Sequence, residues 1–448
     1  MPVDPGEESR MSVQEQASGQ EARPQLVRAV VASAVGTAIE WYDFFLYGVA
    51  AALVFPGLFF PSSTEFVGQL QAFGTFFVGF LARPAGAAIF GHLGDRIGRK
   101  ASLVATLLLM GLATVAIGLL PTHAQIGPWG AVALIVLRTL QGIGVGGEWG
   151  GSVLIALEWA AKDKRRGFVA SWPQFGVPVG LLLANGALFL AHRLPEADFL
   201  AWGWRVPFLL SGLLIAVGLW IRVGVEETPV FAALRDSGET SRQPVLEVLR
   251  LHSPEIVLTA LVRTSQMTAF YLFTTFVLSY GTKVLHLPKE LLLGGVMLSA
   301  TLSMATIPLS GWLSDTLGRR FLTVLGASLL AVYGFVYFGT LGAGVTGALL
   351  LLVLALANPV HDLQFGPQAA LIAEAFPPRL RYTGCSMGFQ LASVTAGGPA
   401  PLVATWLVEK TGSGLSVAWY LAACAIVSIV AVEALARRSR SAMGLDQA

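Results

Sequence analysis

The stretch Gly91-His-Leu-Gly-Asp95-Arg-Ile-Gly98-Arg99-Lys100 has a near copy further along the chain, Gly311-Trp-Leu-Ser-Asp315-Thr-Leu-Gly318-Arg319-Arg320. Both follow the pattern G-x-L-x-D-x-x-G-R-(K/R), and they begin 220 residues apart. Each copy lies between two long apolar segments. A short polar loop repeated at half the chain length predicts a membrane protein that arose by duplication of one unit, as secondary transporters do.

The composition also indicates a chain that uses lipid as its solvent. Of 448 residues, 54% are hydrophobic and only 12% are charged, whereas about 25% are charged in an ordinary soluble domain. The two cysteines, Cys385 and Cys424, lie inside apolar segments, so we expect no disulfide, no metal site and no thiol nucleophile. The chain has no G-x-x-x-x-G-K-(S/T) loop, which argues against ATP as the energy source.

Twelve apolar segments are long enough to cross a bilayer, which takes about 20 residues. They cover residues 28–54, 66–90, 101–120, 129–157, 168–192, 203–223, 253–280, 290–311, 321–341, 346–372, 383–408 and 415–436. The sequence therefore predicts an all-α polytopic membrane protein of two six-helix repeats. Its predicted parts are a disordered cytosolic tail (1–27), an N-terminal bundle (28–223), a cytosolic linker (224–252), a C-terminal bundle (253–437) and a second cytosolic tail (438–448).

The basic residues predict that both termini face the cytosol. With that orientation the inner segments hold 21 Lys and Arg and the outer segments hold five. Cytosolic loops carry the excess of Lys and Arg in membrane proteins.

Ionisable residues within the spans are candidates for function, because each costs about 2.5–3.5 kcal/mol at the helix centre on insertion scales. They are Glu40 and Asp43 in the first span, Arg83 in the second, Arg138 and Glu148 in the fourth, Arg263 in the seventh, and His361 and Asp362 in the tenth. At 1.5 Å per residue, Glu40, Arg138, Arg263 and His361 lie near the midplane, where transporter sites occur.

Two interpretations stay open for the acidic and histidine side chains. Glu40 and Asp43 either carry protons or form a structural hydrogen-bond pair between helices. His361 and Asp362 either exchange protons, since an imidazole ordinarily titrates near about pH 6.5, or satisfy one another. Glu148 lies toward the cytosolic half of its span and belongs either to the substrate and proton site or to an inner gate.

The arginines also have alternatives. Arg83 lies eight residues before the first decapeptide, so it either functions within the protein or snorkels to the headgroups. For Arg138, a role in substrate or proton coupling is favoured over a structural ion pair. Arg263 has no partner in its own helix, which favours a carboxylate of the substrate or of the first span.

Further stretches carry a family resemblance. They include Glu40-Trp-Tyr-Asp43-Phe, Arg138-Thr-Leu-Gln141-Gly142, Trp204-Arg205-Val-Pro-Phe, Glu226-Glu-Thr-Pro229 and Arg379-Leu-Arg381-Tyr-Thr-Gly384. Together with the decapeptides, they resemble the metabolite–proton symporter branch of the major facilitator superfamily. The resemblance implies the major facilitator fold, in which helices 1, 4, 7 and 10 line a central cavity. It also implies proton-coupled uptake of shikimate, 2-oxoglutarate, citrate, proline or betaine across the cytoplasmic (inner) membrane of a bacterium.

The decapeptides are predicted to be gating elements. We expect Asp95 to cap the helix that follows it, and Arg96, Arg99 and Lys100 to anchor the loop at the anionic inner surface. The resemblance implies that this loop holds the halves together on the cytosolic side. In the second copy Thr316 replaces Arg96, which favours the first loop as the charged gate. The predicted gating residues are Gly91, Asp95, Arg96, Gly98, Arg99, Arg83, Glu148, Asp315, Gly318 and Arg319.

The combined prediction is a symporter, not an enzyme, that needs no cofactor beyond protons. The predicted proton-coupling residues are Glu40, Asp43, His361 and Asp362, and the predicted substrate-binding residues are Arg138, Gln141, Arg263 and Tyr42. Two midplane arginines suit a carboxylate, so we expect a small organic acid such as shikimate or a di- or tricarboxylate. The alternative is a proline- or betaine-type osmolyte; a receptor that has lost transport and an intramembrane enzyme are more distant alternatives. The expected partners are the lipid bilayer and a small metabolite, with no nucleic acid and no obligate protein partner.

Overall fold

A computed structural model describes residues 5–61, 64–161, 163–345 and 347–442. These residues form helices and connections without strands, and twelve of the helical segments are long and apolar enough to cross a membrane. The all-α architecture and the predicted number of spans are thereby confirmed.

The N-terminal half contains six spanning helices. They are α1 (Pro5–Leu53), α3 (Glu65–Arg96), α4 (Arg99–Leu119), α6 (Trp129–Trp159), α7 (Arg166–Ala191) and α9 (Arg205–Val223). The short helices α2 (Phe55–Phe59), α5 (His123–Ile126) and α8 (Glu196–Asp198) lie in its connections, and a π-helical turn covers Phe199–Gly203.

The C-terminal half repeats the arrangement with two interrupted spans. The seventh span consists of α12 (Ser253–Val262), α13 (Thr264–Tyr271), a π-helical turn (Leu272–Phe276) and α14 (Val277–Lys283). Then follow α15 (Lys289–Leu317), α16 (Arg319–Gly342) and α17 (Gly347–Ala373). A 3-10 turn (Pro378–Leu380), α18 (Arg381–Ala392), a second π-helical turn (Ser393–Gly397) and α19 (Ala400–Thr411) form the eleventh span, and α20 (Leu415–Ala442) forms the twelfth.

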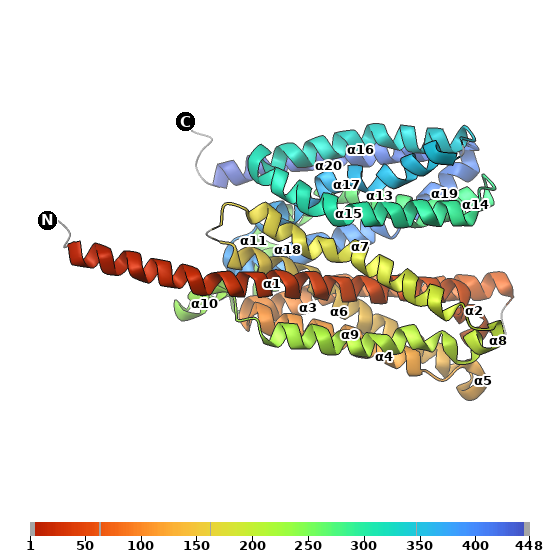
Figure 1. The fold of residues 1–448 in the computed structure, drawn as a ribbon, viewed down its shortest axis with the longest axis horizontal. Helices are drawn as coiled ribbons and strands as arrows, with labels where there is room; N and C mark the ends of the chain where they lie inside the picture. Colours follow the sequence, from red (N-terminus) through yellow and green to blue (C-terminus); the bar gives the residue numbers. More distant parts are fainter. Residues whose placement is uncertain (1–4, 62–63, 162, 346, 443–448) are drawn as a thin grey trace.

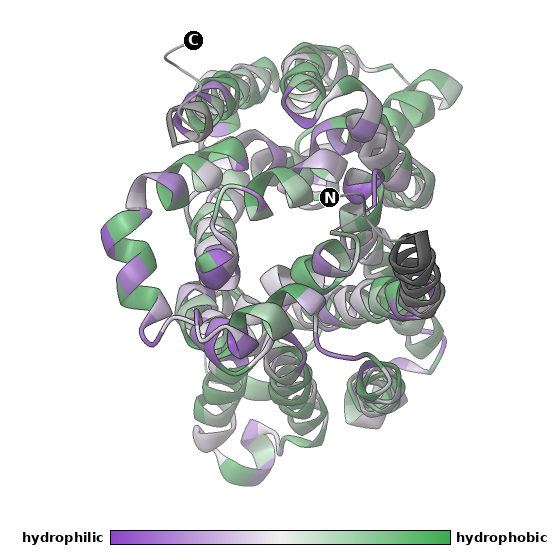
Figure 2. Ribbon diagram, turned by 90° about the vertical axis from the view of Figure 1, so that its left-hand side faces the viewer, coloured by the Kyte–Doolittle hydropathy of each residue, from purple (hydrophilic) through white to green (hydrophobic). Residues whose placement is uncertain are grey.

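The two halves lie side by side, with the C-terminal half above the N-terminal half in Figure 1. We call the end of the bundle that holds both decapeptides the motif end, and the opposite end the far end. The start of α1, the end of α20 and the linker helices α10 (Pro229–Asp236) and α11 (Pro244–Leu251) lie at the motif end. Figure 2, which looks onto this end, shows hydrophilic residues on its turns and linker helices.

Helix α1 differs from the prediction for the N-terminal tail. It begins at Pro5, so its backbone includes residues that we expected to precede the first span, while its membrane-spanning part begins at Arg23. The segment is rich in Glu and Gln, which favour helix. Residues 1–4 and 443–448, the outer parts of the predicted tails, lie outside the described residues.

The decapeptides are mostly helix and contain very short turns. Helix α3 continues through Arg96 and α4 begins at Arg99, so only Ile97 and Gly98 connect them. Gly98 has φ 139° and Gly318 has φ 91°, a region that glycine adopts without strain. The glycine before the basic pair therefore makes the turn, and the preceding Asp is presented from a helix.

Candidate functional site

All the ionisable residues predicted within the spans are buried. The set comprises Glu40, Asp43, Arg83, Arg138, Glu148, Arg263, His361 and Asp362. They separate into two networks inside the N-terminal half, one network inside the C-terminal half, and side chains that lie between the halves.

One N-terminal network joins Asp43 to Arg138 through uncharged side chains. Asp43 accepts hydrogen bonds from Thr114 on α4 (2.8 Å) and Ser211 on α9 (2.6 Å). Gln141 donates to the Thr114 hydroxyl (2.8 Å) and accepts from Arg138. Asp43 is therefore linked to the arginine through Thr114 and Gln141.

The aromatic neighbours of this network belong to the same half. The Tyr42 hydroxyl donates to the Pro207 carbonyl on α9 (2.7 Å), so its polar group is already satisfied there. The Arg138 guanidinium lies 4.0 Å from the centre of the Tyr47 ring, a cation–π contact. Thr114 and Ser211 were missed by sequence reasoning, because single hydroxyl residues in apolar spans carry no distinctive signal.

The second N-terminal network is built on an ion pair between Glu148 and Arg222. Arg222 also donates to the Leu103 carbonyl (2.5 Å), and Glu148 accepts from Thr106 (2.8 Å) and Ser152 (2.9 Å). The pair thus joins α4, α6 and α9. Arg222, next to the last residue of the predicted sixth span, was one of the 21 basic residues counted for the inner segments, whereas its side chain is buried.

Glu40 is buried without an ion-pair partner among the described residues. Its Oε2 atom has no hydrogen-bond partner, and the charges that act on it come from Glu148, Arg83, Arg222 and Asp43. The two first-span carboxylates therefore differ: Asp43 is fully engaged, and Glu40 is not.

The C-terminal network runs from Arg263 to Asp362. Arg263 donates to the Gln266 Oε1 atom (2.7 Å), and the Gln266 Nε2 atom lies 2.8 Å from His361 Nε2. His361 Nδ1 is 2.9 Å from Asp362 Oδ1, and Thr306 donates to Asp362 Oδ2 (2.5 Å). His361 and Asp362 thus satisfy one another, and Gln266 extends the network to the arginine.

Arg83 crosses between the halves instead of snorkelling to the headgroups. Its side chain is buried and donates to Ser393 on the π-helical turn of the eleventh span (3.1 Å). The guanidinium also lies over the Phe80 and Phe44 rings, at 4.5 and 4.9 Å from their centres. Burial against the other half excludes the headgroup interpretation in this conformation.

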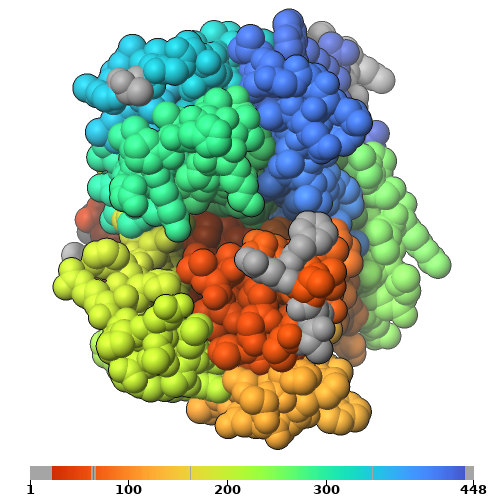
Figure 3. Space-filling model, turned by 90° about the vertical axis from the view of Figure 1, so that its right-hand side faces the viewer, coloured from red at the N-terminus to blue at the C-terminus, as the bar shows by residue number. Residues whose placement is uncertain are grey.

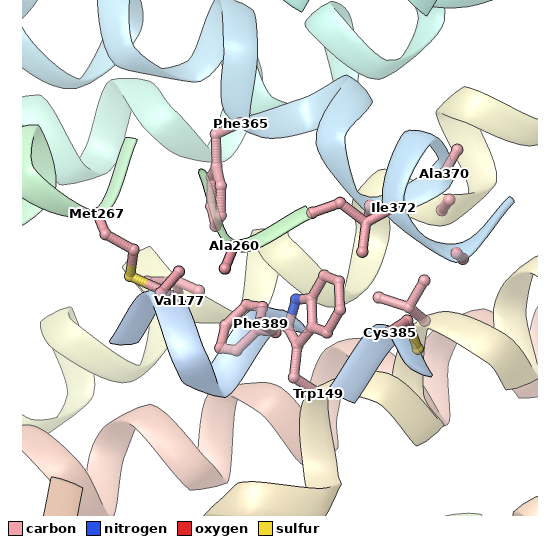
Figure 4. Packing of buried hydrophobic residues seen from close by; sticks show 14 of the residues in the cluster. Trp149, Val177, Ala260, Met267, Phe365, Ala370, Ile372, Cys385 and Phe389 are labelled. Carbon is pink, nitrogen blue, oxygen red and sulfur yellow. The ribbon is translucent and has the colours of Figure 1, made fainter. Parts of the chain in front are cut away.

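Arg263 also lies where the halves meet. Its guanidinium is 4.0 Å from the Phe389 ring centre and 5.3 Å from that of Trp149, which belongs to α6. These two rings stack at 4.1 Å, as Figure 4 shows. Arg263 is 1% exposed, and its Nε and Nη1 atoms have no hydrogen-bond partner in the part of the chain that the structure describes. A buried guanidinium with free donors is suited to bind an anion.

Tyr271 marks the place where charges of both halves converge. It is buried, and Arg83 lies close enough to its hydroxyl to interact with it. Arg83, Arg138 and Glu40 act electrostatically on this hydroxyl, as Arg263 does from the C-terminal half. Arg138 and Arg263, which belong to opposite halves, therefore both act on this hydroxyl.

The motif end is locked by carboxylates that cap helices of the opposite half. Asp95 accepts from the backbone N–H groups of Tyr382 (3.2 Å) and Thr383 (2.8 Å), at the start of α18. Asp315 accepts from those of Gly167 (2.7 Å) and Phe168 (2.9 Å), at the start of α7. The expectation that Asp95 caps the following helix was wrong, because Asp95 lies within α3 and its side chain reaches the other half.

The first decapeptide's Arg99 is not a membrane anchor. It is 0% exposed, pairs with Asp95 (3.0 Å) and Glu158 (3.5 Å), and donates to the Pro378 carbonyl (2.8 Å). The start of α4 is capped instead by Glu227, whose carboxylate accepts from the backbone N–H of Arg99 (3.1 Å). Arg99 therefore belongs to the lock between the halves.

The second decapeptide makes the matching contact through Arg319, which pairs with Glu374; Arg166 of the N-terminal half pairs with the same carboxylate (3.3 Å). Arg96 and Thr316, whose difference favoured the first loop as the charged gate, are both exposed. The charged contacts of the lock therefore come from other positions of the motif.

Comparison with known proteins agrees with this architecture. Residues 33–400 match the model of the Major Facilitator Superfamily. The Shikimate transporter of Escherichia coli (strain K12) is 41% identical over 405 residues, covering 90% of this chain and 92% of that protein. The Inner membrane metabolite transport protein YhjE of the same strain is 39% identical over 410 residues, with 90% and 93% covered.

A more distant relative is the Proline/betaine transporter of Escherichia coli (strain K12), which is 33% identical over 420 residues and covers 91% of this chain and 82% of that protein. Among solved structures, the proton:xylose symporter XylE bound to 6-bromo-6-deoxy-D-glucose superimposes with a TM-score of 0.72 at 18% identity, over 92% of this chain and 95% of that one. These relatives are transporters, not enzymes. The chain belongs to the Major Facilitator Superfamily, in its branch of metabolite transporters.

Proposed function

We propose that this protein is a proton-coupled symporter that imports a small organic acid by alternating access. The observation that carries the proposal is Arg263, a buried guanidinium between the halves with two unpartnered nitrogen atoms. A carboxylate is the natural partner of such a group, since it accepts paired N–H donors and neutralises the charge. The similarity to a shikimate transporter supports an organic acid.

Proton coupling is assigned to the carboxylates of Glu40, Asp43 and Asp362 and to His361. Glu40 has an unpartnered buried oxygen; its ionised form would lack compensation there, whereas its protonated form is neutral. Asp43 and the His361–Asp362 pair each stand at the end of a hydrogen-bonded network that leads to an arginine. In the proposed cycle a proton and the substrate anion bind together, and the loaded protein then opens to the other side.

The motif end is assigned to the cytosol of a bacterial cell, and the protein to its inner membrane. The excess of basic residues supports this orientation. The capping contacts of Asp95 and Asp315 then close the cytosolic side, and the far end is the side from which substrate enters. Figure 3, which looks onto the far end, shows a depression between the two halves.

A zwitterionic osmolyte is the second candidate. Trp41 and Phe270 approach edge to face (5.3 Å between ring centres), and Phe44 lies near Tyr271 (6.5 Å). Aromatic faces from both halves can bind a quaternary ammonium group, and the similarity to proline/betaine transporters supports this alternative.

Proteoliposomes containing the purified protein test the proposal. With an acidic exterior, we expect accumulation of labelled shikimate or 2-oxoglutarate that a protonophore abolishes. Arg263→Ala should lower it by about tenfold or more, as loss of a charge-assisted contact predicts. Arg205→Ala is the control, because Arg205 contacts the backbone carbonyls of Gly118 and Leu120 (both 2.8 Å). Accumulation of only betaine or proline would select the alternative, and unchanged organic-acid uptake in Arg263→Ala would refute the carboxylate site.

A further inference from the structure

The two halves share a short pattern besides the decapeptides. Arg138-Thr-Leu-Gln141 lies in α6, and Arg263-Thr-Ser-Gln266 lies at the junction of α12 and α13. In both, the arginine donates to the Oε1 atom of the glutamine three residues later. In both, the glutamine Nε2 atom continues to a second side chain, Thr114 in one half and His361 in the other.

The chemistry of these groups determines the protonation state of His361. Arginine has only donors, so the Gln266 atom facing Arg263 must be the amide oxygen. The Gln266 atom facing His361 is then the NH₂ group, which can only donate. His361 Nε2 must therefore accept and carries no proton, while Nδ1 carries the proton and donates to Asp362 (2.9 Å). The relay from Arg263 holds His361 neutral.

We propose that Gln266 couples substrate binding to proton binding by reversing its amide. This inference rests on the proposed function, because it requires a substrate carboxylate at Arg263. A carboxylate that binds the Nε–Nη2 edge of Arg263 bidentately uses the unpartnered Nε–H together with Nη2, which now donates to Gln266. Gln266 is thereby released and can rotate. Its oxygen then accepts from His361 Nε2–H, after a proton delivered as hydronium from the outer solution has added to the Nε2 lone pair and left neutral water. One anion and one proton thus enter together, and Asp362 faces the resulting imidazolium.

Gln266 is the residue of the seventh span that makes a polar contact with His361. A crevice with a volume of about 10 Å³ adjoins the His361–Asp362 pair, which is room for about one water molecule. The residues of α7 and α15 that line it are uncharged: Val177, Pro178, Leu181, Ala300, Ser303 and Ile307. The charged groups acting through this site are therefore Asp362 on the same helix and Arg263 across the amide.

The coupling is reciprocal. A carboxylate at Arg263 favours a proton on His361, and a proton on His361 favours the carboxylate by the same factor. The N-terminal pattern cannot act in this way, because Thr114, the partner of Gln141, does not titrate. In the N-terminal half the ionisable group, Asp43, lies one hydrogen bond beyond Thr114, whereas in the C-terminal half the amide itself contacts an ionisable side chain.

The first experiment needs no substrate. The protein labelled with ¹⁵N-histidine is examined by NMR near neutral pH, and His361→Gln identifies the His361 signals among those of the six histidines. We expect neutral His361 with its proton on Nδ1, and a charged imidazolium in Gln266→Glu, whose carboxylate accepts from both neighbours. Gln368→Leu is the control, because this buried amide on α17 donates only to the Val262 carbonyl (3.4 Å). A proton on Nε2 in the wild type, or no change in Gln266→Glu, would overturn the proposal.

The second experiment measures coupling with labelled shikimate in proteoliposomes. Gln266→Leu should retain exchange of shikimate across the membrane but lose about tenfold of proton-driven accumulation, the usual size of a coupling effect. Accumulation equal to that of the wild type would reject the role of Gln266. If the wild type moves neither shikimate nor any other organic acid, the proposed function fails, while the histidine spectra still decide whether the amide controls His361.

Discussion

At the scale of residues, the opposite charges of Arg138 and Asp43 are linked through uncharged groups. Gln141 and Thr114 stand between Arg138 and Asp43. A directly paired buried charge is costly to separate, about 3–5 kcal/mol when one partner is lost. A hydrogen-bonded relay leaves each charge able to take a new partner during a cycle, which suits residues that bind and release ligands.

The Glu148–Arg222 pair is the contrasting case and should be structural. Its four polar contacts lie inside the N-terminal half. Either Glu148→Gln or Arg222→Gln should lower the free energy of unfolding by about 3–5 kcal/mol, because one buried charge is left alone. Thermal unfolding of the purified variants in detergent measures the effect.

The double variant Glu148→Gln/Arg222→Gln separates a structural pair from a working one. It should be more stable than either single variant, since no unpaired charge remains. If the loss of stability in the double variant equals the sum of the losses in the two single variants, the pairing is contradicted. Retained transport in the double variant would also exclude Glu148 from the substrate site.

At the scale of elements, the lock at the motif end depends on helix starts that are capped from the opposite half. An N-terminal cap contributes about 1 kcal/mol, so two caps bias the halves toward closure without preventing opening. The native thiol of Cys385 reports on this contact, since it is 0% exposed and lies near Gly150 of α6.

Removal of a cap should open the motif end. In a Cys424→Ser background, Asp315→Ala should raise maleimide labelling of Cys385 by about fivefold, the factor that corresponds to about 1 kcal/mol. Asp95→Ala should raise it further, because it also removes an ion-pair partner of the buried Arg99. Asp95→Asn should have the smaller effect, because asparagine caps a helix almost as well as aspartate. Equal labelling in all variants would mean that the caps do not hold the halves together.

Close helix approach at the lock also requires Gly91. A Cβ there would lie 2.7 Å from the Thr383 Cα, so the backbone of α18 would have to move. Gly91→Ala should therefore increase Cys385 labelling as the cap variants do, because only a small residue lets the two helices approach this closely. Gly74→Ala on the same helix has no atom within 4 Å of its Cβ and should leave labelling unchanged.

The elements were largely predictable from the sequence, and their partners were not. The apolar lengths located all twelve spans. The hydrogen-bond partner of Asp95 could not be predicted, because Thr383 is 288 residues away in the chain and nothing in the local sequence indicates the pairing. Arg222 was misplaced because a cation at a span end ordinarily reaches the headgroups. Gln266 did carry a usable signal, the repeated spacing of arginine and glutamine in both halves.

At the scale of the whole molecule, the structure is closed at the motif end and hollowed at the far end (Figure 3). The hydrogen bonds of Asp95 and Asp315, among the described residues, join the halves at one end of the bundle. The direction of transport therefore depends on which end faces the cytosol. The charge distribution predicts that the motif end faces the cytosol, because the segments on its side hold 21 basic residues and those on the other side hold five.

Cysteine labelling determines this orientation. Both native cysteines are buried, so their replacement gives a background for single reporters on exposed positions. In intact cells, an impermeant maleimide should label Lys410→Cys at the end of α19 and not Ser237→Cys after α10; inside-out vesicles should give the reverse. If Ser237→Cys is labelled from outside, the motif end is extracellular and the capping contacts close the outer side. The far-end depression would then open to the cytosol, and the path proposed for substrate entry would be the path of release.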